Sequence, residues 1–440
     1  MTALWGPGEH AFPGQRLEEF LLWAAAEGAS DIAFQTGEPA LMDVDGKLLR
    51  ATSAALDSTA MQFLIERMFN ASGDGILRSG RAIDCSFAVR EDRRRTRRFR
   101  VNISPVQVDH GFGANIVLRV LPDAVPGFEE LGTEPEIVEA WELCRGLTLV
   151  TGVPGSGKST LLAAGTRRLL ENGAGRIQSF EAPIEYVFDG IADGDALMSS
   201  AEIPRHFLTF ADGLRSSLRR RPSAVIVGEA RDRETVEAVV RAADYGIAVY
   251  STAHTTGVAA TVRRMLAEFP AEEREERGAA LIDVLHMVVS QVLAPNPQGG
   301  LTALREWLVF DRDFKRELLG MPQSAWPAAI SEEVERVGSS MASAAEAAYC
   351  AWKLRHMDLL RVAPAVAGKL PKAPRPNRAG NVPERERAGM SRPKGLAGSN
   401  ASPPAAPEPG SDLEILIGIP RKEESTREEG RHGDPRDAGD

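Results

Sequence analysis

Residues 152–160 have the composition and spacing of a phosphate-binding loop. They read Gly-Val-Pro-Gly-Ser-Gly-Lys-Ser-Thr and match G-x-x-x-x-G-K-[ST]. Glycines let backbone N–H groups approach a polyphosphate, a lysine reaches the β- and γ-phosphates, and a serine hydroxyl holds Mg²⁺. An apolar run at 146–151 precedes the loop and a helical pattern at 161–170 follows it, which is the context that the motif requires. We therefore expect a nucleoside triphosphate to bind at Gly152, Val153, Pro154, Gly155, Ser156, Gly157, Lys158, Ser159 and Thr160.

An acidic residue follows a second apolar run. Residues 224–227 are Ala-Val-Ile-Val, which is typical of a buried strand, and Gly228 and Glu229 come next. A carboxylate at the carboxyl end of a parallel strand faces the nucleotide crevice. There Mg²⁺ needs an oxygen ligand besides Ser159. Glu229 is therefore predicted to be the Walker B acid and, together with Ser159, a metal ligand.

Two more carboxylates flank Pro183 after a third apolar run. Phosphoryl transfer needs a group that orients the attacking water, and a glutamate can do this or act as general base. Spacing alone does not separate Glu181 from Glu185, so both are candidates. His254 follows another apolar run within Tyr-Ser-Thr-Ala-His-Thr-Thr, where a histidine suits sensing of a γ-phosphate. A purely structural histidine is the alternative.

The elements that must position these groups alternate between strands and helices. Strand-like apolar runs occur at 147–151, 176–180, 224–227 and 248–252. Strands separated by helical segments predict a largely parallel sheet with helices on both faces. This is the α/β organisation of a RecA-like P-loop NTPase core. Residues 326–360, rich in Ala and Glu, are helical in composition.

The chain before residue 122 has a different pattern. Runs at 85–89 and 98–103 alternate apolar and polar residues, and helical patterns lie around them. A mostly antiparallel sheet flanked by helices is the expected result. Arginines cluster at 93–98, and we interpret them as a solvated or subunit-contacting face, with a nucleic-acid patch as the alternative.

Composition and turn residues divide the chain into five predicted parts. These are an N-terminal α+β domain (1–121), a linker rich in proline and glycine (122–132), an ATPase domain (133–325), a helical segment (326–363) and a disordered tail (364–440). The tail is rich in Pro, Arg, Gly, Ser and Ala and nearly lacks aromatic residues. Its apolar stretch at 412–420 is either without consequence or a docking segment for a partner.

Bulk properties exclude several classes of protein. A net charge of −10 and a pI near 5.4 argue against a protein that mainly coats nucleic acid. The three cysteines, Cys85, Cys144 and Cys350, are far apart and lack metal-ligand spacing, so we expect buried or incidental thiols. Neither a signal peptide nor an apolar run of membrane-spanning length is found. A cytoplasmic protein is expected.

The order of the motifs resembles the PilT/VirB-type secretion ATPases. It runs from Gly-x-x-x-x-Gly-Lys-Ser through Glu-x-Pro-Ile-Glu-Tyr, Leu-Arg-x-x-Leu-Arg-Arg-x-Pro and Val-Gly-Glu-x-Arg-Asp to Ser-Thr-x-His-Thr. The similarity extends from residues 29–32 to residues 304–308. The runs at 201–206, 257–264 and 304–310 are most similar to the DotB/TraJ branch. That branch serves Dot/Icm-type IVB secretion and the related conjugative plasmid transfer.

This resemblance implies a hexameric ring ATPase with an N-terminal PAS-like domain, a C-terminal RecA-like domain, and ATP and Mg²⁺ at the site. It makes Glu185 the catalytic glutamate, Glu229 the Walker B acid and His254 the His-box histidine. Arginines that bring positive charge to the nucleotide are implied at Arg98, Arg100 and Arg119, with Arg215 and Arg219 as weaker candidates. The implied partners are other copies of the chain and the inner-membrane and cytoplasmic components of a type IV secretion or conjugation system. Those components would recruit it to the inner membrane, without strong direct binding of nucleic acid.

Two positions depart from the pilus-retraction pattern. Ala182 stands where those ATPases have an aspartate, and Ile247 stands where they have a further histidine. Either change can slow turnover, although Lys158, Glu185 and Glu229 remain. A pilus retraction or assembly ATPase, and a nucleotide-gated docking component with weak hydrolysis, are therefore the alternatives to a secretion motor.

Overall fold

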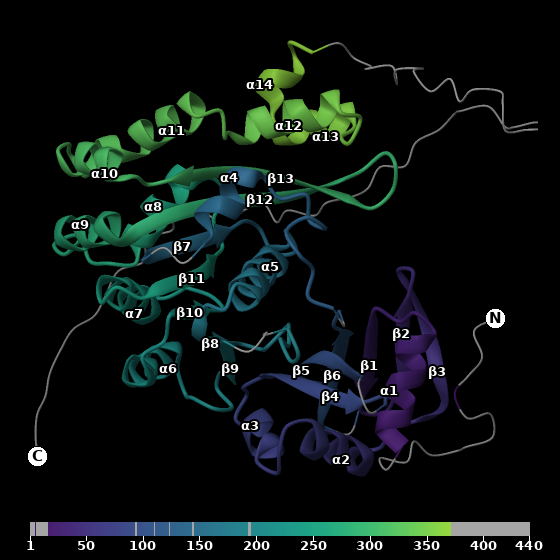
Figure 1. Cartoon of the computed structure of the whole chain (residues 1–440). Helices are drawn as coiled ribbons and strands as arrows, with labels where there is room; N and C mark the ends of the chain where they lie inside the picture. The colour runs from purple at the N-terminus through teal and green to yellow at the C-terminus, as the bar shows by residue number, and fades with distance from the viewer. Residues whose placement is uncertain are drawn as a thin grey trace, which may run out of the picture. The chain divides into compact units, whose positions relative to one another are not determined.

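The computed structural model describes residues 5, 16–92, 95–109, 111–122, 124–142, 145–191 and 195–370. The strands of these residues form two sheets, one from residues 31–120 and the other from residues 146–309 (Figure 1). In these ranges, no helix combines the length and the apolar character that crossing a bilayer requires.

The first sheet has six antiparallel strands in the order β3-β2-β1-β6-β5-β4. Its strands are β1 (Asp31–Gln35), β2 (Pro39–Val44), β3 (Lys47–Ala55), β4 (Ile83–Arg90), β5 (Thr96–Val108) and β6 (Gly111–Val120). Its helices are α1 (Leu17–Ala26), α2 (Ser58–Met68) and α3 (Gly73–Arg78). Apolar side chains of α1 and α2 share one core with alternate residues of β4 and β5. The predicted antiparallel sheet flanked by helices is confirmed.

The second sheet has seven strands in the order β13-β12-β7-β11-β10-β8-β9. They are β7 (Gly146–Thr151), β8 (Gly175–Glu181), β9 (Ala196–Glu202), β10 (Ala224–Val227), β11 (Ala248–Ala253), β12 (Leu285–Pro295) and β13 (Leu301–Val309). Only the pair β12–β13 is antiparallel among the pairings described. The largely parallel sheet was predicted correctly, whereas β9, β12 and β13 were not among the predicted strands. The apolar run of β12 continues directly from a helix, so hydrophobicity alone cannot separate the two elements.

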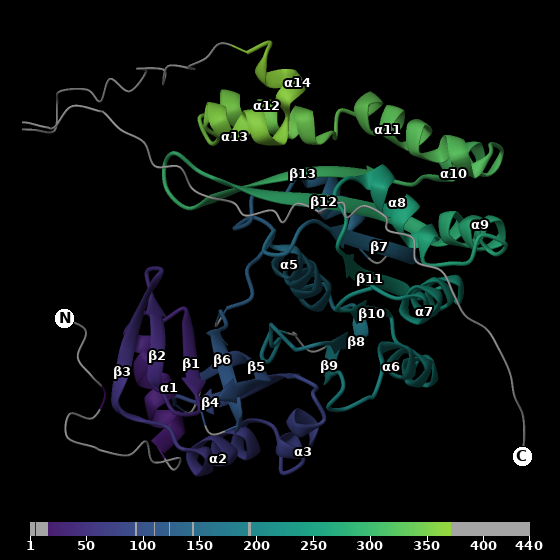
Figure 2. The same ribbon diagram turned by 180° about the vertical axis from the view of Figure 1, so that it is seen from behind.

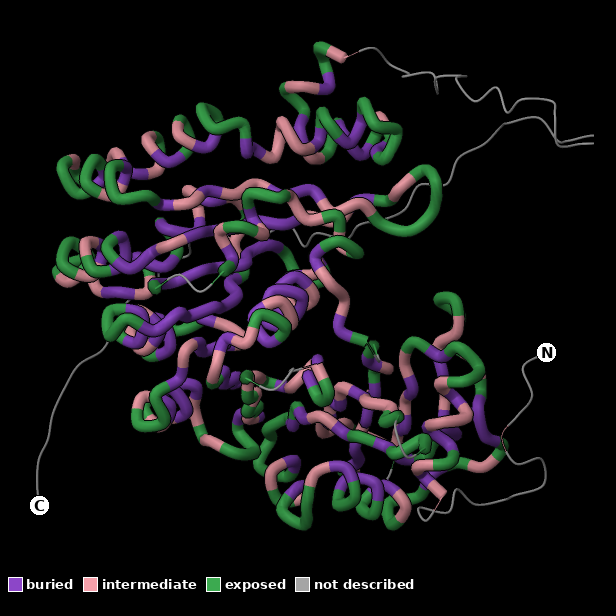
Figure 3. The backbone as a smooth tube through the Cα atoms, in the orientation of Figure 1, coloured by how far each residue is buried: buried purple, intermediate pink, exposed green. Residues whose placement is uncertain are grey.

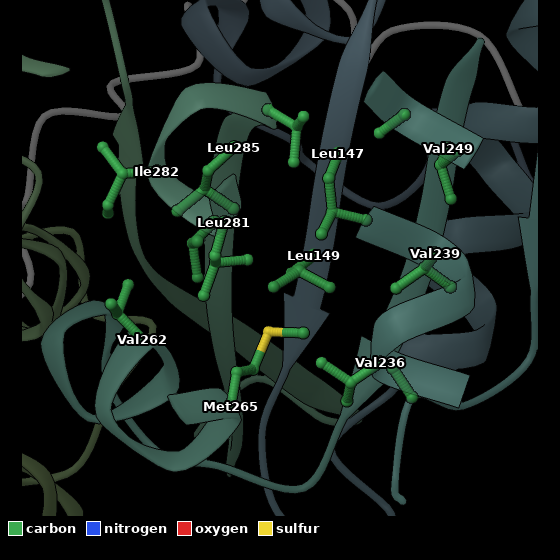
Figure 4. Close-up of a cluster of buried hydrophobic side chains, with 14 of the residues drawn as sticks. Leu147, Leu149, Val236, Val239, Val249, Val262, Met265, Leu281, Ile282 and Leu285 are labelled. Atoms are coloured by element: carbon green, nitrogen blue, oxygen red, sulfur yellow. The ribbon is translucent and has the colours of Figure 1, made fainter. Parts of the chain in front are cut away.

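Helices cover both faces of this sheet. They are α4 (Pro135–Ala140), α5 (Lys158–Glu171), α6 (Phe210–Ser217), η2 (Leu218–Arg220), α7 (Arg233–Asp244), α8 (Val258–Ala267), α9 (Arg274–Val284) and α10 (Arg312–Leu319). Successive side chains of a strand point to opposite faces. Leu149 of β7 therefore enters the core beneath α7, α8 and α9 (Figure 4), and Val150 enters the core beneath α4 and α5. Figure 3 shows the buried strands between the partly exposed helices.

The C-terminal helices form a layer beside β12 and β13 (Figures 1 and 2). They are η3 (Gln323–Ala325), α11 (Trp326–Arg336), α12 (Met341–Cys350), α13 (His356–Val362) and α14 (Pro364–Ala367). Helices α11 to α13 agree with the helical composition of residues 326–360. A disordered tail was predicted to begin at residue 364. The structure instead has α14 there, and Ala367 of this helix is buried among side chains of α12 and α13. Residues 371–440, including the stretch at 412–420, lie outside the described residues.

Candidate active site

The phosphate loop joins the carboxyl end of β7 to the N-terminus of α5. Gly152 has a φ of 145°, and a Cβ there would lie 2.3 Å from the backbone oxygen of Gln291 on β12. Gly157 has a φ of 80°, and a Cβ there would lie 2.8 Å from the side-chain nitrogen of Gln291. Both positions therefore need glycine for backbone conformation and for space. The loop ends at the first turn of α5, where unpaired backbone N–H groups and the helix dipole favour an anion.

Lys158 Nζ is the centre of a chain of polar contacts. It donates hydrogen bonds to the backbone oxygens of Gly152 at 2.9 Å and Val153 at 3.0 Å, and it lies 3.3 Å from His254 Nδ1. His254 Nε2 lies 3.3 Å from Glu229 Oε1. Because an ammonium group only donates, Nδ1 accepts from it and Nε2–H donates to the carboxylate. The predicted lysine, histidine and Walker B acid are therefore neighbours.

The surroundings of Lys158 suit a γ-phosphate and a divalent cation. Burial lowers the pKa of Lys158, and the carboxylates of Glu229 and Glu185 oppose that shift. In the described part of the chain, the buried Ser156 hydroxyl has no hydrogen-bond partner, although Ser156 is not among the residues that line the cavity. Ser159 and Glu229 line the same cavity as Lys158. Mg²⁺ takes one or two carboxylates together with phosphate oxygens and waters, so this small set of donors fits it.

The two carboxylates after β8 have different surroundings. Glu181 accepts a hydrogen bond from Ser179 Oγ at 2.7 Å. Burial raises the pKa of Glu181 to about 7, and the charge of Glu185 adds to that effect, while hydrogen bonds from Ser179 and the Glu185 backbone oppose it. Glu181 therefore takes up a proton near neutral pH. Glu185 instead faces arginines.

Arg98 and Arg100, both on β5, contact Glu185. Arg100 Nη1 donates to Glu185 Oε1 at 3.1 Å, and Arg98 donates to the backbone oxygen of Glu185. Arg119 pairs with Asp31 of β1 at 2.9 Å and is not among the residues lining the cavity. Of the three predicted arginines, two therefore reach the segment that follows β8.

The weaker arginine candidates lie on other helices. Arg215 of α6 pairs with Asp212 at 3.2 Å and with Glu234 at 3.1 Å, and Arg219 is exposed on η2. Neither lines the cavity that contains Lys158. Of the predicted arginine cluster at 93–98, residues 93 and 94 lie outside the described residues.

One cavity of about 330 Å³ collects most of the predicted groups. The predicted site residues in its lining are Arg100, Pro154, Gly155, Lys158, Ser159, Glu181, Glu185, Glu229 and His254. Apart from Arg100, they come from loops and termini at the carboxyl ends of β7, β8, β10 and β11. Ligands bind at this edge of open parallel sheets, and the volume lies in the range of small-molecule sites.

Three residues near the site had no role in the sequence interpretation. Arg231 lines the cavity, and Tyr186 Oη lies 3.0 Å from Thr160 Oγ1. Gln291 lies under the phosphate loop and donates to the backbone oxygen of Ser156 at 2.6 Å. For Gln291 a signal was present, because a polar residue within the apolar run of β12 needs a buried partner.

Comparison with known proteins gives a consistent result. Residues 10–300 match the family model described as Type II/IV secretion system protein. The type IV pilus retraction ATPase PilT of Pseudomonas aeruginosa is 35% identical over 293 residues, which make up 67% of this chain and 82% of that protein. The protein YggR of Escherichia coli is 32% identical and covers 67% of this chain and 86% of its own length.

Two solved structures are similar along almost their whole length. The Legionella pneumophila ATPase DotB has a TM-score of 0.77 and 35% identity, and the match covers 81% of this chain and 98% of that chain. The pilus retraction motor PilT with bound ADP has a TM-score of 0.68 and 28% identity, and the match covers 80% of this chain and 98% of that chain. The RecA-like α/β fold expected from the sequence is confirmed.

Proposed function

Because this chain belongs to the type II/IV secretion system protein family, we propose that it is the motor ATPase of a type IVB secretion or conjugative plasmid-transfer apparatus. The chain is a P-loop enzyme that hydrolyses ATP, as its named relatives do. The observation that carries the finer assignment is the similarity to DotB. Its TM-score and identity, 0.77 and 35%, exceed the 0.68 and 28% of the PilT structure.

In the proposed mechanism, the cavity holds the triphosphate and Glu185 orients the attacking water. Lys158 and the loop N–H groups bind the β- and γ-phosphates. Arg100 orients the Glu185 carboxylate by its 3.1 Å contact. Ser159 and Glu229 would hold Mg²⁺, which neutralises phosphate charge when bound. His254 couples Lys158 to Glu229 and thereby senses the γ-phosphate.

The family resemblance supports a ring of six copies. The contacts of Arg98 and Arg100 with the Glu185 segment show that residues from both sheets meet at the site. We propose that adjacent subunits share such arginines and that the domains move about residues 122–132. Arg119 takes part only if it leaves Asp31. Specific activity should then rise with protein concentration, and a constant specific activity in a proven monomer would contradict the ring.

The proposed place of action is the cytoplasmic side of the inner membrane, where components of the apparatus recruit the ring. The net charge of −10 supports protein partners over direct binding of nucleic acid. A pilus motor is the second candidate, because a pilus retraction ATPase is 35% identical to this chain. A docking component with weak hydrolysis is the third, because Ala182 lines the cavity where pilus-retraction enzymes have an acid.

Deleting the gene from its host separates the candidates. Conjugation frequency or delivery of secreted proteins should fall to background, while pilus retraction stays intact, and wild-type protein should restore transfer. A Lys158→Ala variant expressed to the same level should not. Loss of pilus retraction with normal transfer would favour the pilus motor. Rescue of transfer by a variant shown to bind but not hydrolyse ATP would favour the docking component.

A further inference from the structure

Arg305 on β13 is almost completely buried, with 1% of its side chain exposed. Its Nη1 donates to the backbone oxygen of Gly132 at 3.2 Å and to Glu134 Oε2 at 3.0 Å, and its Nη2 donates to the backbone oxygen of Leu131 at 3.1 Å. Its Nε donates to Gln291 Oε1 at 2.7 Å. A buried guanidinium is stable only when its donors are paired, so these four bonds form one unit. That unit connects the predicted linker to β12.

Gln291 carries the connection on to the phosphate loop. Its Nε2 donates to the backbone oxygen of Ser156 at 2.6 Å. Its backbone oxygen is the atom that a Cβ at Gly152 would meet, and its side-chain nitrogen is the atom that a Cβ at Gly157 would meet. Gln291 therefore packs against the phosphate loop through one hydrogen bond and two close approaches.

Arg305 decides which way the Gln291 amide points. A guanidinium has donors only, so the amide oxygen must face Arg305 Nε. The amide nitrogen then faces Ser156, whose backbone oxygen accepts from it. Without the arginine, only the Ser156 oxygen favours this orientation, because a rotated amide would place two oxygens against each other below the loop.

We propose that Arg305 is a positioning residue for ATP binding. It acts through Gln291 on the conformation of the phosphate loop and makes that conformation depend on the position of the linker. When the linker moves away from β13, the backbone oxygens of Leu131 and Gly132 move with it. The guanidinium then loses two of its partners, and its contact with Gln291 loosens. The linker part of this proposal rests on the proposed movement of the two domains. The part that joins Arg305 to the loop does not.

Steady-state kinetics of the full-length protein test the first part. Arg305→Lys keeps the charge but cannot make all four bonds, and Gln291→Glu keeps an acceptor for Arg305 but has no donor for Ser156. Each should raise KM for ATP about tenfold and change kcat by less than about twofold, because neither residue touches the reacting atoms. An unchanged KM in both variants, with a normal thermal midpoint, would overturn the positioning role.

A double-mutant cycle shows whether Arg305 acts through Gln291. In a Gln291→Leu background, Arg305→Lys should raise KM no further. A merely structural arginine would instead give additive increases, about a hundredfold for the double variant if each single change costs about tenfold. That additivity would contradict the proposal.

Arg167 of α5 offers a matched control. It also donates to a backbone oxygen of the linker, that of Val125 at 2.7 Å, but its side chain otherwise contacts Glu130 and Glu171 and not Gln291. Arg167→Met should leave KM within about twofold of wild type, and a tenfold rise would make linker attachment in general, not Arg305, responsible. Glu134 follows the linker by two residues and binds the same guanidinium as the Leu131 and Gly132 oxygens. Glu134→Gln therefore weakens the attachment of Arg305 on the side that faces the linker and should raise KM about threefold. No rise there would overturn the linker part, while the Arg305–Gln291 part is judged by the cycle.

Discussion

The phosphate loop and the segment after β8 face the same cavity but are built in different ways. The loop gets its shape from three glycines with positive φ, Gly152, Gly155 and Gly157, and from the start of α5, all within a few residues of Lys158. The geometry of the segment after β8 depends on a residue far away in the sequence, because Arg100 is 85 positions away from Glu185. Phosphate binding is therefore a local property of the chain, whereas the choice of the catalytic acid depends on tertiary contacts.

The largest effect should come from the local element. Lys158→Ala removes the only cation that the loop itself supplies to the phosphates, so nucleotide binding or hydrolysis should fall about a hundredfold or more. ATP binding by isothermal titration and phosphate release measure the two quantities. Normal turnover in this variant would contradict the assignment of the loop.

The second-largest effect should come from the segment after β8, whose geometry depends on Arg100. Arg100→Ala removes the group that holds Glu185, and kcat should fall about ten- to a hundredfold with little change in KM. Arg90 is exposed at the end of β4 in the same sheet and serves as the control, because Arg90→Ala keeps the contact between Arg100 and Glu185. Equal losses in both variants would point to general damage of the first sheet.

Glu181 should make stability depend on pH. Burial raises its pKa from 4.5 to about 7, so between these values the folded protein holds a proton that the unfolded chain has released. Stability therefore falls as the pH rises through this window, by at most about 3 kcal/mol. Glu181→Gln cannot titrate, so its thermal midpoint relative to wild type should be higher at pH 8 than at pH 5. A constant difference would show that Glu181 does not carry the proton.

The smallest effect is expected at Ala182, which lies in the segment after β8, between Glu181 and Glu185. An acid at this position would place a like charge beside Glu181 and Glu185. Because the added negative charge makes a neighbouring carboxylate a better proton acceptor, Ala182→Asp should raise kcat about two- to threefold. Single-turnover hydrolysis measures this, with Ala182→Asn as the uncharged control. A rise in both variants would mean that charge is not the cause.

The sequence predicted the parts of the site that depend on neighbours in the chain. The loop, Glu229 after β10 and His254 after β11 were found because each ends an apolar run, and parallel strands bring their carboxyl ends to one edge. Both sheets were predicted for the same reason, from alternation in one and from continuous apolar runs in the other. These signals are short-range.

What was missed depends on contacts between distant residues. Nothing local to Arg305 indicates that it binds Gln291 and the linker, and Tyr186 meets Thr160 only because β8 and α5 fold together. Residue 364 looked like the start of a tail because Ala and Pro dominate there, but burial of Ala367 against other helices stabilises α14. The choice between Glu181 and Glu185 belongs to the same class, since only their surroundings differ.

That choice is best tested by comparing Glu185→Gln with Glu181→Gln. Both substitutions keep the size of the side chain and remove its charge, and bound ATP and hydrolysed ATP are measured on the same samples in a rapid-quench experiment. Glu185→Gln should bind ATP as wild type does and hydrolyse it at least about a hundredfold more slowly, while Glu181→Gln keeps most of its turnover. A dead Glu181→Gln beside an active Glu185→Gln would show that the base is the buried carboxyl and not the one that Arg100 holds.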